Sequence, residues 1–265
     1  MSETVQRSGS YYWKNVVFQV EGSLFRVPRF HFETSSEVFS DMFALPQADS
    51  KPEEGDGDAH PIKLEGIEAK DFECLLKVLY PRSPPMKEDL TTEHKWVSVL
   101  KLTTLWRFLG FRALAIDRLT SCSMNASERV VLGRQYSVYA WLRTGYIDLV
   151  KQSQTLSMED VEKIGYLPSV RIFRLREELR KRHRKNNAVR LSTVTGKSHF
   201  HCAKCHNYGN QTNTLCCSCA GLANTSDYDL QLSISEIEKV VDGEFATELD
   251  DVQLEDKTFL IPTSP

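Results

Sequence analysis

Five of the seven cysteines of the chain lie between Cys202 and Cys219. Cys202 and Cys205 form one Cys-x2-Cys pair, Cys216 and Cys219 form a second, and ten residues separate the pairs. Two such pairs let two tight turns present four thiolates to one tetrahedral Zn²⁺, at about 2.3 Å per bond. Four protein ligands leave no position open for water. The sequence therefore predicts a structural zinc site rather than a catalytic one.

Other ligand sets fit the same stretch. Cys217 can take the place of Cys216, and His201 or His206 can substitute for a thiolate. A redox disulfide is disfavoured because no thioredoxin-like βαβ pattern surrounds either pair. A zinc deaminase would need His-x-Glu and then Pro-Cys-x-x-Cys, which the chain lacks. We expect residues 191–222 to form a Cys-rich module that folds only with zinc.

The remaining sequence carries little catalytic chemistry. Cys74 and Cys122 fall on apolar helix faces and are predicted to be packing residues. The chain shows no credible Ser/His/Asp, paired-carboxylate or Gly-rich phosphate motif, so we expect a non-enzymatic protein. With 265 residues, 41% of them hydrophobic, it can bury a substantial core in one or two domains. Neither a signal peptide nor a membrane span is indicated, which predicts an intracellular protein of the cytoplasm, the nucleus or both.

Charge is unevenly distributed, although the formal net charge is only -3. Residues 171–190 contain nine Lys or Arg and two acids, a balance of +7, whereas residues 223–265 contain eleven acids and two Lys, a balance of -9. The basic run Arg180–Lys185 fits a solvated helix end, a nuclear-import signal or a contact to a phosphate backbone. We interpret residues 223–265 as an acidic tail with one short helix, disordered from Asp242 onward and able to screen the basic helix.

The spacing of apolar residues and the turn-forming residues predict the helices and strands of the N-terminal half. After a disordered arm of residues 1–11, alternating apolar residues predict a hairpin over 15–28 with a turn at Glu21-Gly22. Thr34 and Glu37 have capping-box spacing and predict the start of a helix. An acidic loop, a short strand at 61–64 and a helix at 71–80 come next.

Further helices are predicted in the rest of the chain. One spans 93–109 and is ended by Gly110; another spans about 125–152 and is broken near Gly145. Ser157 is expected to cap a short helix that Gly165 ends, and Ser169 to cap a helix that runs to about residue 185.

The segments VVFQVEGSLFRVPRFHFETSSEVFSDMF, PIKLEGIEAKDFECLLKVLYP and WVSVLKLTTLWRFLGFRALAIDRL resemble, in order and spacing, the BTB/POZ domain and in particular its fungal-type variants. The resemblance implies an α+β, predominantly helical fold: a BTB/POZ domain over 12–122, with a small sheet flanked by helices, then a helical extension over 123–190 and the zinc module. Two positions depart from the family. Asn15 stands where many members carry Asp, and Val27-Pro28 where many carry Ala-His; both lie near surfaces that the family uses for dimerisation or partner binding.

The resemblance implies a protein-interaction module with protein partners, a second copy of the chain among them. Two other functions stay open. A nuclear factor would contact nucleic acid through the basic helix and the zinc module. A substrate adaptor would dock on the cullin scaffold of a ubiquitin ligase, an interpretation that rests on family analogy alone.

Overall fold

A computed structural model describes residues 6–9, 11–45, 54–81, 92–193, 199–201, 208–210 and 234–260. The chain divides into two compact units. The first holds residues 1–125, 135–138 and 252–265, and the second holds residues 126–134 and 139–251. The C-terminal segment therefore contributes residues to both units.

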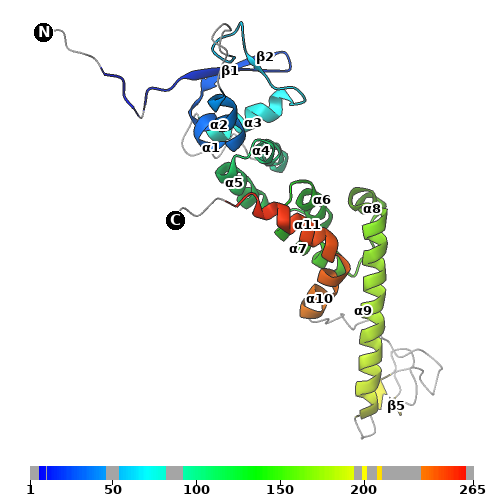
Figure 1. Ribbon diagram of the computed structural model, residues 1–265. Coiled ribbons are helices and arrows are strands. Elements are labelled where there is room, and N and C mark those ends of the chain that lie inside the picture. Colours follow the sequence, from blue (N-terminus) through cyan, green and yellow to red (C-terminus); the bar gives the residue numbers. More distant parts are fainter. Residues whose placement is uncertain are drawn as a thin grey trace, which may run out of the picture. The chain divides into compact units, whose positions relative to one another are not determined.

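A small sheet opens the first unit. Strand β1 (Asn15–Val20) pairs antiparallel with β2 (Ser23–Pro28) and parallel with β3 (Ile62–Lys63), in the order β2-β1-β3 (Figure 1). The predicted hairpin, its Glu21-Gly22 turn and the short third strand are confirmed. The Val17 amide donates to the carbonyl oxygen of Gly55 over 2.8 Å, so the loop before β3 lies against the central strand.

Aromatic rings from separate elements fill the core below this sheet. Phe18 on β1 lies with its ring centroid 4.7 Å from Phe32, 5.6 Å from Phe39 and 5.5 Å from Phe72. Tilted and edge-on pairs of this kind are the geometries that aromatic quadrupoles favour. The three partners come from α1 (Phe30–Ser35), α2 (Glu37–Ala44) and α3 (Ala69–Leu79).

The predicted capping box at Thr34 is wrong. Thr34 lies inside α1, where its hydroxyl donates to the carbonyl oxygen of Phe30. The cap of the next helix, α2, is Ser36, which has extended backbone and accepts from the Phe39 amide at 3.1 Å. Its hydroxyl also donates to the Trp106 carbonyl oxygen at 2.6 Å. Ser36 is preferred because one buried hydroxyl satisfies the helix start and a distant backbone group together.

The predicted helix end at Gly110 is also wrong. Helix α4 spans Glu93–Leu105, and α5 begins at Leu109 and runs to Thr120, so that Gly110 lies inside it. The reversal is made at Arg107, whose φ is 52°, and the Phe108 amide donates back to the Thr103 carbonyl oxygen. A non-glycine residue occupies the left-handed position because burial of Phe108 fixes the chain there.

The second unit is built from helices. It contains residues of α6 (Ala126–Gln135), α7 (Tyr139–Lys151), α8 (Met158–Ile164), α9 (Tyr166–Thr193), α10 (Ile234–Glu244) and α11 (Ala246–Lys257). The break predicted near Gly145 is wrong, since Gly145 lies within α7. A Cβ atom there would lie 2.9 Å from the Ala126 carbonyl oxygen, so glycine permits the close crossing of α6 and α7.

The predicted boundary between α8 and α9 is partly confirmed. Ser157 and Asp160 form a complete capping box, and Gly165, with φ 99°, ends α8. Ser169 does not cap α9, because that helix already begins at Tyr166; the Ser169 hydroxyl donates to the carbonyl oxygen of Gly165 instead.

The prediction of disorder from Asp242 onward is wrong. Residues 234–257 form α10 and α11, and their inward face is buried at Ile237, Val241, Phe245, Leu249 and Val252. The ring of Phe245 stacks on Tyr146 at 3.8 Å between centroids. Figure 1 shows α10 beside α7. Two short strands, β4 (His199–His201) and β5 (Tyr208–Asn210), pair antiparallel.

Candidate protein-interaction surface

Aromatic side chains are exposed on the segment that leads into β1. Tyr11, Tyr12 and Trp13 are 79%, 61% and 49% exposed, and Phe30 at the start of α1 is 40% exposed. The Trp13 ring lies 5.8 Å from that of Phe30. The segment is tied to the domain because the Arg29 amide donates to the carbonyl oxygen of Lys14 at 2.7 Å. Tyrosine and tryptophan are enriched at protein interfaces, and exposed apolar patches mark binding sites.

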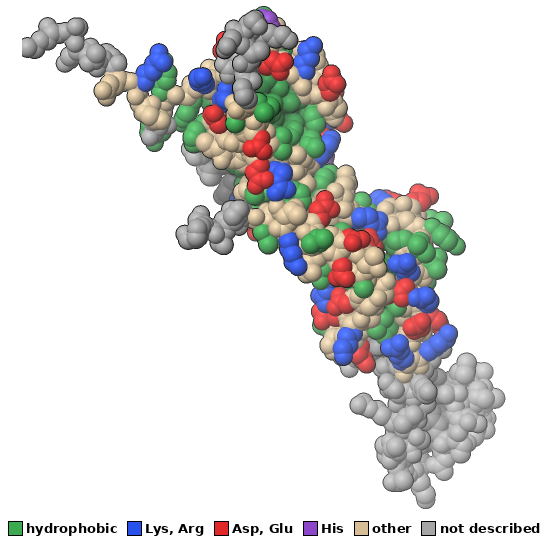
Figure 2. All heavy atoms as spheres, in the orientation of Figure 1, with side chains coloured by type: hydrophobic (Ala, Val, Ile, Leu, Met, Phe, Trp, Pro, Cys, Tyr) green, Lys and Arg blue, Asp and Glu red, His purple; other side chains and the backbone are tan. Residues whose placement is uncertain are grey.

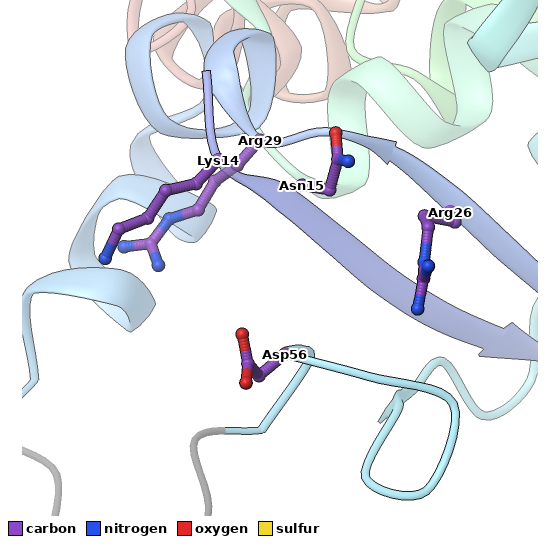
Figure 3. Close-up of a pocket in the computed structure, with 5 residues that line it drawn as sticks. All are labelled: Lys14, Asn15, Arg26, Arg29 and Asp56. Atoms are coloured by element: carbon purple, nitrogen blue, oxygen red, sulfur yellow. The ribbon is translucent and has the colours of Figure 1, made fainter. Parts of the chain in front are cut away.

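A cationic cavity of about 280 Å³ is lined from Lys14 onward, the residue that follows Trp13. It is lined by Lys14, Asn15, Arg26, Arg29 and Asp56. In Figure 3 the Lys14 and Arg29 side chains extend in the same direction from neighbouring segments, Arg26 projects from β2, and Asp56 faces them from the loop before β3. Three cations face one carboxylate in this lining, so the cavity favours acidic groups.

Carboxylates at the rim hold the cavity cations in place. Arg26 pairs with Asp58 at 3.2 Å, and both side chains are exposed. Arg29 is more confined: it pairs with Glu33 at 3.3 Å and its guanidinium lies 3.8 Å from the centre of the Phe43 ring. The exposed Arg26–Asp58 pair is weak and exchangeable, so a partner's carboxylate can take the place of Asp58.

Asn15 is the first residue of β1 and pairs with Pro28 across the hairpin. It is one of the two departures from the family pattern, and it lines the cationic cavity. A neutral amide at this place leaves the cationic excess of the lining intact, whereas an aspartate would reduce it. The departure therefore alters the charge of the surface and leaves the strand pairing unchanged.

Next to this surface, His31 is a packing residue. Its ring centroid lies 5.3 Å from that of Tyr80 and 5.7 Å from that of Phe111. Burial lowers the pKa of His31, which favours the neutral ring. Burial raises the pKa of Tyr80 to about 12, and its hydroxyl donates to the Pro28 carbonyl oxygen. Both rings are therefore held in their neutral forms at neutral pH.

The predicted zinc ligands Cys202, Cys205, Cys216 and Cys219 lie outside the described residues, as do the alternatives Cys217 and His206. Within the described part of the chain, no group of three or more His, Cys, Asp or Glu side chains could hold a metal ion. The prediction that Cys74 packs in the core is confirmed, because it is buried on α3 and burial raises the pKa of its thiol.

The basic helix is offset by acids where it is described. Lys181 and Arg182 pair with Glu177 and Glu178 one turn earlier, at 3.7 and 3.8 Å. Glu244 of α10 pairs with Arg171 and Arg174, which lie near the start of the basic helix α9. Figure 2 shows positive and negative side chains intermixed over α9 and α10. Charge counting by segment misses this arrangement.

Sequence reasoning also missed the aromatic and cationic residues of this surface. They come from the arm, from β2 and from the loop before β3, and only the fold brings them together. One signal was present: the run Tyr11-Tyr12-Trp13 is unusually aromatic for a segment interpreted as a disordered arm and its junction.

Comparison with known proteins identifies a domain family for the N-terminal part of the chain. No curated protein matches the chain. In the described part of the chain, no helix is both long and apolar enough to cross a membrane. The family model of the BTB/POZ domain matches residues 6–116, which include the sheet, α1 to α4 and most of α5. Domains of this family bind other proteins. Residues 6–116 of the chain are therefore a BTB/POZ domain, as the sequence predicted.

Proposed function

We propose that this chain is a non-enzymatic protein-interaction protein whose BTB/POZ domain associates with a second copy through the aromatic arm and the cationic cavity. The observation that carries the proposal is the exposure of Tyr11, Tyr12 and Trp13, which directly precede the cavity-lining Lys14 in the chain. Rigid aromatic rings contribute large contact areas at low entropic cost.

Charge supports pairing of identical surfaces. In a two-fold interface the same surface of each copy meets the other, and residues away from the axis contact different residues of the other copy, so the surface must be self-complementary. This one carries the cations Lys14 and Arg26 and also the carboxylates Asp56 and Asp58. Two copies can therefore match cations to acids in both directions.

Size-exclusion chromatography with light scattering tests the proposal. The particle formed by the full chain should have about twice the mass of one chain, which is 30.3 kDa. Replacing Tyr12 and Trp13 by Ser should return it to one chain's mass. The matched control is Tyr166→Ser on α9, which removes another exposed tyrosine (78%) outside the domain and should leave the dimer intact. A wild-type chain that is monomeric at 100-fold dilution and at stock concentration alike would refute self-association.

We further propose that residues 191–222 bind one structural zinc ion through Cys202, Cys205, Cys216 and Cys219. The support is the spacing of the two Cys-x2-Cys pairs, and the pairing of β4 with β5 on either side of the first pair. Elemental analysis should find about one zinc per chain. Cys202→Ser should lose it and Cys217→Ser should keep it. Loss of zinc from the Cys217 variant alone would instead assign Cys217 as the ligand in place of Cys216.

Nucleic-acid binding is the weaker alternative, because Glu177, Glu178 and Glu244 pair with cations of the basic helix. It predicts association with DNA or RNA that weakens steeply with salt, since phosphate contacts release counterions. Docking on a cullin predicts retention of the chain by a cullin N-terminal domain. Nucleic-acid binding and cullin docking can each be measured on the same purified chain that is used to measure self-association.

A further inference from the structure

The corner between α4 and α5 holds the last described residues of the chain. Arg112 of α5 is only 4% exposed. One of its terminal nitrogens donates to the carbonyl oxygens of Tyr136 and Ser137, at 2.9 and 3.1 Å, and to the carboxylate of Asp256 at 3.3 Å. Two of these contacts are structural, because they bind the turn after α6. The third binds the end of α11.

An aromatic ring sits beside the same guanidinium. The centre of the Phe259 ring lies 4.2 Å from the Arg112 guanidinium carbon and 5.1 Å from that of Arg107. Arg107 also donates to the Thr258 carbonyl oxygen at 2.7 Å, and it pairs with Glu37 of α2. A cation over the face of an aromatic ring is attracted by the ring quadrupole. The two arginines thus hold a carboxylate, a carbonyl and a ring at once.

The docked segment presents these groups in a fixed pattern. The Phe259 amide donates to the Asp256 carbonyl oxygen at 3.0 Å, so a turn continues past α11. Residues three apart in such a turn share a face, which aligns Asp256 with Phe259. The recognition element is therefore a carboxylate followed after two residues by an aromatic side chain.

The receptor side is preformed. Arg107 has the left-handed φ of 52° that the end of α4 imposes, and Arg112 is anchored by the two carbonyl oxygens after α6. The segment contributes polar and cation–π contacts, and Leu260 beside Phe259 is exposed. The Asp256 side chain is also 30% exposed, so the outer edge of the docked segment is open to solvent.

We propose that Arg107 and Arg112 form a peptide-docking site for acid-x-x-aromatic segments, filled here in cis by Asp256–Phe259, and that a partner protein carrying this pattern binds by displacing it. The site goes beyond the proposed association surface and shares no residue with it. Either proposal can fail while the other stands.

The test uses the full chain with Asp256→Ala and Phe259→Ala, which clears the site and leaves both arginines in place. A fluorescent peptide of residues 250–260 should bind this variant saturably, as read by anisotropy. Binding to the wild-type chain should be at least about tenfold weaker, because a tethered segment competes at an effective concentration of millimolar order. A peptide carrying the same two Ala substitutions is the matched control and should not bind.

Arg107→Met in the cleared chain should abolish peptide binding, whereas Lys163→Met, a cation of α8 in the other unit, should leave it unchanged. If circular dichroism shows that the cleared chain is unfolded, the single variant Phe259→Ala serves as receptor with the same expectation. Absence of saturable binding to a folded receptor, or equal binding of the control peptide, would overturn the proposal.

Discussion

A methyl group added at Gly133 should destabilise the chain, although Gly→Ala inside a helix ordinarily stabilises it. Gly133 lies in α6, where α7 crosses it closely. An ideal Cβ atom there would lie 2.6 Å from the amide nitrogen of Leu142, 3.0 Å from its Cα and 3.1 Å from its Cβ. Two of these three atoms are backbone, so they cannot move away as the end of a flexible side chain would.

Two opposing terms decide the sign for Gly133→Ala. Helix propensity favours alanine by about 1 kcal/mol. Overpacking of a close contact costs about 1–3 kcal/mol, and more when backbone atoms must shift. Because a separation of 2.6 Å is far inside van der Waals contact, we place the cost at the upper end, which leaves a net loss of about 2 kcal/mol.

Thermal and urea unfolding of the full chain measure this loss. Each kcal/mol corresponds to about 2–4 °C in Tm for a chain of this size. The control is Gly243→Ala in α10 of the same unit, where the added Cβ meets no atom within 4 Å and only the propensity gain applies. A Gly133 variant as stable as the Gly243 variant would show that the helices separate freely, and the crossing argument would fail.

Three further predictions concern single groups. Ser36→Ala should cost about 1–2 kcal/mol in urea unfolding, because it removes both the α2 cap and a buried donor. Burial raises the pKa of Asp71, but hydrogen bonds from Lys101 and Ser98 outweigh it, and the pKa in the folded chain is lowered. The carboxylate therefore stabilises the fold above its ordinary pKa, and this stabilisation is lost as the pH falls through the pKa of the folded chain. Asp71→Asn should flatten the acid limb of a curve of stability against pH. Gly165→Ala should cost about 1–3 kcal/mol, because φ is 99° at the α8–α9 junction; an unchanged Tm would contradict this.

The sheet and the core of the domain were predictable because their information is local. Val16, Phe18 and Val20 alternate along β1 and all three are buried, the period-2 signal of a strand, although Val17 on the other face is buried as well. The turn after β1 uses Glu21 with φ 51° followed by Gly22, so turn chemistry also lies within two residues. Elements whose energetics are decided by near neighbours can be found from one sequence.

Helix ends were less predictable because tertiary contacts decide them. Gly110 and Gly145 look like helix ends, yet both lie inside helices, and the chain reverses at Arg107 and Ser137, each with φ 52°. In the first reversal the buried ring of Phe108 anchors the corner. Glycine at 145 serves a crossing with α6, which no local pattern reveals.

The acidic C-terminal segment shows why charge alone misleads. Its acids have arginine partners far earlier in the chain: Asp242 pairs with Arg143 at 2.8 Å and Glu248 with Arg134 at 2.7 Å. Part of the charge that suggested disorder is thus paired in the fold. A competing signal was present in the sequence, because apolar residues recur there at helical spacing. All five of them are buried in the structure: Ile237, Val241, Phe245, Leu249 and Val252. Periodicity reports burial and net charge reports only composition, so the apolar stripe carries more weight when the two disagree.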